Sequence, residues 1–141
     1  MNQPPGTVER TLHFVRTVHG FLLFAMFMYV LTAEKILPHQ ARTLNSMVGT
    51  DFLVLGILFV GATVLIRAKL VGTALDTLRS TPDDPIALGK WRKGVILTDV
   101  LLESVLLYGF ALRFLGGTLQ QSLPFYAAEI GLMILWWPKR P

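Results

Sequence analysis

The chain has 141 residues, of which 52% are hydrophobic and only 16% are charged. Its apolar residues come in long blocks rather than in spaced stripes, which argues against a soluble domain and predicts helices that cross a membrane. The net charge is +4, but Lys and Arg stand at the ends of the apolar blocks and form no continuous patch, which argues against a nucleic-acid partner. The absence of cysteine excludes disulfides and thiolate metal sites.

The first apolar block predicts a membrane helix over about 12–37, ended by Pro38 because proline cannot continue a helix. The residues before it lack the charged start and cleavage site of a signal peptide, so we expect this span to be an uncleaved anchor. A polar connector follows at 38–50. The second block predicts a span over about 51–70, with Asp51 capping the helix by accepting from its free N–H groups.

Beyond the second span the pattern becomes amphipathic, so we expect this helix to leave the membrane and to continue to about Arg79. The segment 80–85 reads as a turn outside the membrane. Asp84 is expected to cap the third helix, with Pro85 at its first position, where the missing N–H costs nothing. The membrane part of this third helix is expected over about 94–115.

The glycine pair at 116–117 predicts the end of the third helix. The last apolar block predicts a shorter span over about 122–137, opened by Ser122 and Pro124. The tryptophan pair at 136–137 is typical of the aromatic belt at a membrane interface.

The distribution of Lys and Arg orients these spans, because basic residues are enriched on the cytoplasmic side. With the N-terminus inside, the inner side carries Arg10, Arg16, Arg67, Lys69, Arg79, Lys90, Arg92, Lys93, Lys139 and Arg140. The outer side carries Lys35, Arg42 and Arg113. The sequence therefore predicts an all-α integral membrane protein, a single membrane domain over 1–141 with four transmembrane helices. Both termini are expected in the cytoplasm, and the location is the inner (plasma) membrane.

The acidic residues within the predicted spans are the candidate functional residues of this chain. Asp99 and Glu103 are one helical turn apart and share a face. Glu103 lies about 13–14 Å from the start of its span near Gly94, close to the bilayer centre. Glu129 is expected about 10 Å inside the last span. Carboxyl groups at this depth are expensive, so each needs a partner or a function.

Three interpretations of these acids stay open. In the structural one, Asp99 pairs with Arg16 or His19 of the first helix, and Glu103 and Glu129 are neutral or hydrogen-bonded within the bundle. In the functional one, Glu103, together with Glu129, takes up and releases protons. A ligand or lipid site is a third possibility.

Metal, haem and enzyme chemistry have little support. His13 and His19 are six residues apart on one helix and point in different directions, and His39 falls in the polar connector. The chain shows no Ser/His/Asp arrangement, phosphate-binding glycine loop or HExxH zinc motif. We therefore expect no metal, no cofactor and no enzymatic activity.

Small residues predict places where helices approach closely. Ala127 and Gly131 form a small-xxx-small pair in the last span, and Gly56 and Gly61 lie in the second. Such positions serve packing within one bundle or contact with a partner, and both uses stay open.

The segment 103–109, Glu-Ser-Val-Leu-Leu-Tyr-Gly, resembles the ion-carrying helix of rotary ATPase proteolipid (c) subunits. The hairpin of the second and third helices is similar to that family's hairpin. The resemblance implies that Glu103 is a proton-binding carboxylate and Tyr108 its hydrogen-bond neighbour. In its core the second helix has Gly56 and Gly61, where that family's inner helix has glycine at nearly every fourth position.

More of the chain resembles small four-helix membrane proteins of bacteria that share an E-x-x-x-x-Y-G helix and an aromatic-Pro-basic tail, here 136–141. Our first hypothesis is a non-enzymatic membrane subunit that packs in a homo-oligomer or a larger membrane complex within the lipid bilayer. The alternative is a proton-translocating, proteolipid-like protein that uses Glu103.

Overall fold

The structure, a computed structural model, describes residues 6–35 and 46–141, and within these ranges the chain is helical with short connections and no strand. The elements are α1 (Thr7–Lys35), α2 (Ser46–Arg67), the π-helix η1 (Ala68–Gly72), α3 (Thr73–Ser80), α4 (Pro85–Phe114) and α5 (Leu119–Leu135). The prediction of an all-α chain with four main helices is confirmed.

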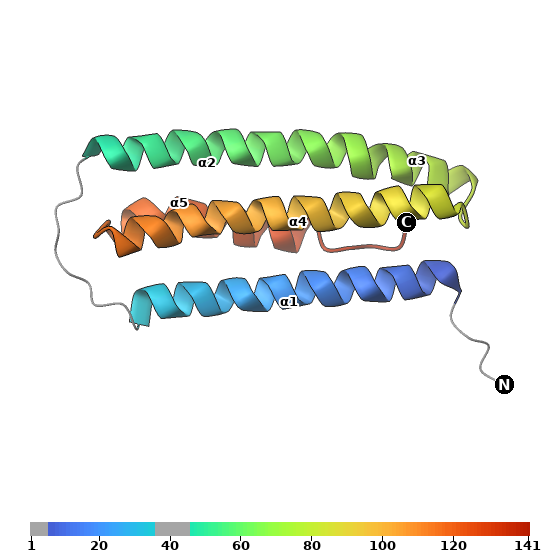
Figure 1. The fold of residues 1–141 in the computed structure, drawn as a ribbon, viewed down its shortest axis with the longest axis horizontal. Coiled ribbons are helices and arrows are strands. Elements are labelled where there is room, and N and C mark those ends of the chain that lie inside the picture. The colour runs from blue at the N-terminus through green and yellow to red at the C-terminus, as the bar shows by residue number, and fades with distance from the viewer. Residues whose placement is uncertain (1–5, 36–45) are drawn as a thin grey trace.

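Helix α4 is the element on which the other helices pack. Figure 1 shows it between α1 and α2, with α5 behind it, and each of these three helices contacts α4. We call the end of the bundle where α1 begins and α3 turns into α4 the terminal end. We call the end where α4 turns into α5 the far end.

The core changes composition along the bundle because α5 is short. At the terminal end Val15, Leu78 and Trp91 pack together from α1, α3 and α4. Toward the far end α5 joins, and Met26 of α1 packs with Met133 of α5 and residues of α4. The C-terminal end of α5 therefore lies partway along the bundle, at the level where three helices become four.

Three helices are long and apolar enough to cross a membrane by length and composition: Thr7–Lys35, Val48–Ser80 and Pro85–Phe114. Helix α5 has 17 residues and a length of about 25 Å, somewhat less than the hydrocarbon core of about 30 Å. Large apolar side chains such as Phe21 and Leu65 are exposed on α1 and α2. Exposed apolar side chains of this kind are typical of helices that cross a membrane.

Two predicted helix ends are confirmed. The Asp84 carboxylate accepts hydrogen bonds from the backbone N–H groups of Ile86 and Ala87, at 2.8 and 3.1 Å, and Pro85 is the first residue of α4. Gly116 follows α4 with φ of 93°, a left-handed conformation that favours glycine.

The prediction for the start of the second helix is wrong. Helix α2 begins at Ser46, so Asp51 lies inside the helix with an exposed side chain and caps nothing. No residue from 46 to 51 breaks a helix, and Gly49 lies beside Gln121 of α5. Pro38 and the remainder of the predicted connector fall outside the described residues.

The start of the last helix also differs from the prediction. Helix α5 begins at Leu119, and its cap is Thr118, whose hydroxyl accepts from the Gln121 N–H while the Gln121 side chain accepts from the Thr118 N–H. This reciprocal capping box outweighs the turn signals of Ser122 and Pro124, which lie inside the helix. Pro124 is the sixth residue of α5, so the helix continues past it with one backbone hydrogen bond fewer.

Helices α2, η1 and α3 form one continuous helix to Ser80, in agreement with the predicted extension to about Arg79. The wide π turn follows Arg67 directly. At this level α4 approaches so closely that a Cβ atom on Gly94 would lie 3.0 Å from the Val71 side chain. The π turn therefore lies at a tight contact between two helices and beside the half-buried Arg67.

Candidate functional site: buried polar pairs along α4

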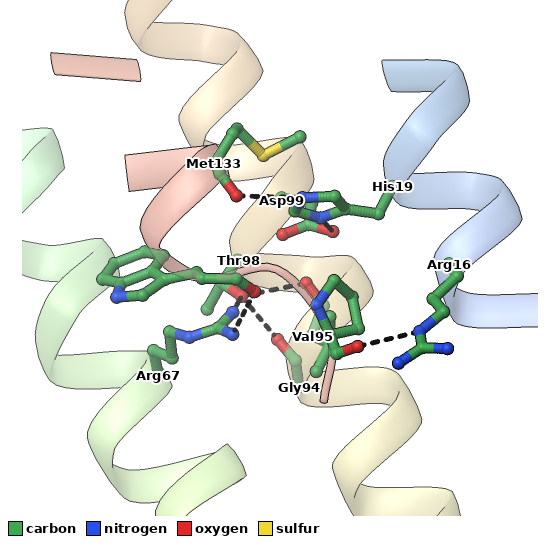
Figure 2. A network of polar contacts seen from close by, with 10 residues as sticks. Arg16, His19, Arg67, Gly94, Val95, Thr98, Asp99 and Met133 are labelled. Carbon is green, nitrogen blue, oxygen red and sulfur yellow. Dashed lines mark hydrogen bonds and ion pairs between the residues drawn. The ribbon is translucent and has the colours of Figure 1, made fainter. Parts of the chain in front are cut away.

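A histidine and an aspartate meet where α5 ends inside the bundle. The Nδ1 atom of His19 lies 2.8 Å from Oδ2 of Asp99, and the two side chains are 0% and 1% exposed. The other ring nitrogen, Nε2, lies 3.0 Å from the carbonyl oxygen of Met133. Of the two partners that the sequence offered for Asp99, the structure brings His19 to it (Figure 2).

These contacts fix the number of protons in the pair. A carbonyl oxygen only accepts, so Nε2 of His19 must carry hydrogen. One further proton then lies between Nδ1 of His19 and the carboxyl group of Asp99. It is bound either to the nitrogen or to a carboxyl oxygen. The pair is an imidazolium with a carboxylate or an imidazole with a carboxylic acid, and it is neutral in both forms. A buried one-proton pair of this kind is a place where a proton can be stored or passed on.

Arg67 approaches the same level from α2. Its guanidinium donates to the Thr98 hydroxyl at 2.9 Å and to the Trp136 carbonyl at 3.1 Å, and it lies 4.6 Å from the centre of a Trp136 ring. The Thr98 hydroxyl in turn donates back into its own helix, to the carbonyls of Gly94 or Val95. The guanidinium of Arg67 therefore joins α2 to α4 and to the C-terminal end of α5.

Arg16 does not contact Asp99. Its Nε donates to the Pro138 carbonyl at 3.0 Å, so its place is beside the chain that follows α5 (Figure 2). Together Arg16, His19 and Arg67 supply donors to three carbonyl groups at and beyond the end of α5. A helix end inside a bundle needs such donors, and positive groups are favoured there by the helix dipole.

Glu103 and Glu129 face each other one turn deeper. Glu129 is 0% exposed, while Glu103 is half-buried, and their carboxyl groups lie within hydrogen-bonding reach of each other. If both groups were ionised, Oε2 of Glu103 and both oxygens of Glu129 would be buried without a hydrogen-bond donor among the described residues. They become hydrogen-bond partners only when one of them holds a proton.

A third polar pair, at the far end, was not found from the sequence. The guanidinium of Arg113 donates twice to the Glu34 carboxylate, with both distances 2.7 Å, and once to the Gly117 carbonyl at 2.6 Å. From the sequence, Arg113 was counted only among the basic residues of the outer side. The similar depth of Glu34 and Arg113 on the first and third spans was the available signal, but it does not tell which way the side chains point.

Tyr108 lies on a different face of α4 from the one that the resemblance implied. Its ring packs edge-on against Phe52 and Phe59 of α2, with centroids 5.8 and 5.6 Å away. Glu103 is five residues earlier, about 140° around the helix, and lies toward Glu129. The expectation that Tyr108 is the hydrogen-bond neighbour of Glu103 is therefore wrong.

The four small residues divide into two groups. A Cβ atom on Gly56 would lie 2.6 Å from the Phe125 ring, so this glycine permits the contact between α2 and α5. Gly61 and Gly131 have nothing within 4 Å of that position, and Ala127 is exposed. Of these four residues, Gly56 is the one at a close contact with another helix in the described part of the chain.

The polar groups suit proton exchange better than metal binding. No group of three or more His, Asp or Glu side chains in residues 6–35 and 46–141 is placed to hold a metal ion. Asp99 and Glu103, on consecutive turns of α4, each lie within hydrogen-bonding reach of another titratable side chain. No protein-family model matches this chain, and neither curated proteins nor solved structures give a significant match.

Proposed function

We propose that this is a non-enzymatic, multi-pass protein of the inner (plasma) membrane that binds and transfers protons through the pair of Glu103 and Glu129. The three long apolar helices support insertion in the membrane. The excess of Lys and Arg on one side supports cytoplasmic termini. The observation that carries the proton-transfer proposal is the carboxyl pair: the two groups lie within hydrogen-bonding reach of each other, and Oε2 of Glu103 and both oxygens of Glu129 are buried without a hydrogen-bond partner among the described residues.

The neighbours of the carboxyl pair support transfer rather than storage alone. Asp99 precedes Glu103 by one helical turn, about 5–6 Å between Cβ atoms, and shares its own proton with His19. A proton that enters from the terminal end therefore meets two acceptor pairs in succession. Glu103 is also half-buried rather than enclosed, so its carboxyl group is open to exchange or to a partner.

A carbodiimide labelling experiment tests the proton site. The reagent adds to protonated carboxyl groups in apolar surroundings, so we expect label on Glu103 or Glu129 in lipid vesicles, mapped by mass spectrometry. The label should decline as pH rises, because the carboxylate does not react. The exposed carboxylate of Glu9 is the internal control and should stay unmodified.

Proton flux into vesicles that contain a trapped pH indicator tests the transfer. Glu103→Gln and Glu129→Gln should each lower the flux, because glutamine cannot give up a proton, and Glu9→Gln should leave it unchanged. An unchanged flux in Glu103→Gln, with normal protein content in the vesicles, would contradict proton transfer through this pair.

A second function, that of a subunit in a homo-oligomer or a larger membrane complex, is favoured by a different observation. Ala127 and Gly131 lie on an exposed face of α5, where no part of the described chain fills the space beside Gly131. Small residues on an outer face allow the backbone of another membrane helix to approach.

Native mass spectrometry of the protein in mild detergent tests the subunit proposal. Gly131→Leu should reduce the oligomer or release a co-purifying partner, since the larger side chain holds a second helix away. Gly89→Leu is the control, because Gly89 also has open space beside it but lies near the start of α4. A wild-type protein that is a monomer without a partner would exclude this function.

A further inference from the structure

We propose that α1, α5 and the C-terminal residues form a binding site for one phospholipid with an anionic headgroup. Arg16 and Arg140 would hold the phosphate at the terminal end, and an acyl chain would lie in a groove between α1 and α5. This site requires the membrane insertion proposed above but does not depend on proton transfer.

The headgroup end is a pocket of about 400 Å³ that is built from both ends of the chain. Glu9, Leu12, His13 and Arg16 line it from α1, and Arg140 lines it from the C-terminal residues. Arg140 is brought there because Pro138 is buried and its carbonyl accepts from Nε of Arg16 at 3.0 Å. That bond uses only one of the three guanidinium nitrogens of Arg16. The planar edge formed by its two terminal nitrogens suits a phosphate group.

The charges of the pocket favour an anion. Two guanidinium groups, from Arg16 and Arg140, face the single carboxylate of Glu9, and His13 adds positive charge whenever it is protonated. Basic pockets between membrane helices near the cytoplasmic surface are a recognised type of lipid-headgroup site. A net anionic phospholipid therefore matches the lining better than a zwitterionic one.

The acyl-chain end is an apolar groove of about 550 Å³. Its lining includes Gly20, Leu23, Phe27 and Val30 of α1, with Ile130 and Ile134 of α5. The groove is open at Gly20, because no atom from elsewhere in the described structure lies within 4 Å of the position that a Cβ would take.

The pocket and the groove are aligned along one face of α1. Glu9, His13 and Arg16 continue into Gly20, Leu23, Phe27 and Val30 at steps of three and four residues, which share a helix face. From Gly20 to Val30 the groove runs about 15 Å. This is about half of a hydrocarbon core of about 30 Å and so the depth of one leaflet. A polar pocket at one end and an apolar groove of leaflet depth are the two parts of a phospholipid site.

Native mass spectrometry after incubation with equal amounts of phosphatidylglycerol and phosphatidylethanolamine tests the headgroup. We expect one retained phosphatidylglycerol. Arg140→Gln should weaken its binding about fivefold and the double variant Arg16→Gln/Arg140→Gln roughly 25-fold. Lys139→Gln is the matched control and should not change binding, because Lys139 is exposed and does not line the pocket. Arg140→Gln alone keeps the bond between Arg16 and Pro138, so its effect is independent of the folding of the C-terminal residues.

The groove is tested with Gly20→Leu, which places a larger side chain in the acyl-chain space, and with Gly61→Leu as the control on α2; a Cβ atom at either position meets no atom within 4 Å. Gly20→Leu should release the lipid and Gly61→Leu should not. Equal retention of the two phospholipids, or unchanged retention in Arg140→Gln, would overturn the proposal. Lipid loss in Arg140→Gln but not in Gly20→Leu, with inorganic phosphate as an effective competitor, would identify a soluble phosphate site instead and would also overturn it.

Discussion

His19 and Asp99, 80 positions apart in the sequence, are joined by a contact of 2.8 Å in the interior of the bundle. The second ring nitrogen of His19 is committed to the Met133 carbonyl. The imidazole therefore links α1, α4 and α5 at one point. Its tautomer is set by the Met133 carbonyl, which can only accept a hydrogen bond, so Nε2 carries hydrogen.

The fixed tautomer makes a prediction about Asp99. Asp99→Asn should cost only about 1 kcal/mol of unfolding free energy, because the asparagine amide donates to Nδ1 of a neutral His19. Asp99→Ala should cost about 3 kcal/mol, since it leaves a buried nitrogen unpaired and a cavity beside it. Unfolding in detergent micelles measures both. Equal costs for the two variants would show that the hydrogen bond does not matter.

A double-mutant cycle separates His19 from Arg16 as partners of Asp99. The costs of Asp99→Ala and His19→Ala should be non-additive by about 1–3 kcal/mol, because both remove the same interaction. Asp99→Ala and Arg16→Ala should be additive within about 0.5 kcal/mol, since Arg16 bonds to Pro138 instead. Coupling of Asp99 to Arg16 rather than to His19 would contradict this arrangement.

Arg67 should not be replaceable by lysine. Arg67→Lys keeps the charge but cannot reach both Thr98 and the Trp136 carbonyl, so we expect a loss of about 1.5–3 kcal/mol in unfolding free energy. Arg79→Lys is the control. The pair of Arg79 with Asp76 is exposed, and its loss should change stability by less than about 0.5 kcal/mol. Similar effects of the two substitutions would disprove a special role for the guanidinium.

Gly109 allows α4 and α5 to approach. A Cβ atom there would lie 2.8 Å from the Tyr126 ring and 3.0 Å from Cβ of Phe125, so Gly109→Ala should destabilise the protein by about 1–3 kcal/mol. Gly131→Ala has open space and should leave the stability of the monomer unchanged or slightly raised. Thermal unfolding of the two variants checks this, and a stabilised Gly109→Ala protein would refute the close contact.

The pair of Glu34 and Arg113 can be tested by exchange of charge. Glu34→Gln and Arg113→Gln should each cost about 2–3 kcal/mol, because each leaves a partly buried charge without its bidentate partner. The swapped variant Glu34→Arg/Arg113→Glu should recover part of that loss. A swap that is worse than both single variants combined would mean that the surroundings of Arg113, including the Gly117 carbonyl, are more important than the pair.

The helix ends that depend on one local interaction could be predicted from the sequence. Asp84 with Pro85, and the glycine after α4, act within a few residues, so their roles were predicted. Thr118 and Gln121 form an equally local capping box that was overlooked in favour of Ser122. Asp51 was misread because a potential cap has no effect where the chain is already helical.

The candidate site was only partly predictable. The acids Asp99, Glu103 and Glu129 stand out because ionisable groups in apolar helices are rare and costly. Their partners depend on the rotation of each helix about its axis, which a nearly continuous apolar pattern does not define. For this reason the sequence left Asp99 with two partners, and the contact of Glu103 with Glu129 emerged only from the packed helices.

By itself the sequence determined an all-helical chain, because long uninterrupted apolar blocks permit little else. It predicted four membrane spans, and among the described residues three helices are long and apolar enough to cross a membrane. Only the tertiary structure decided that α4 is central, that α5 ends inside the bundle, and that His19, Arg67 and Arg16 supply donors around that end. The physical reason is that apolar burial is non-directional and readable from composition. Hydrogen bonds and ion pairs are directional, so their partners are fixed only when the helices pack together.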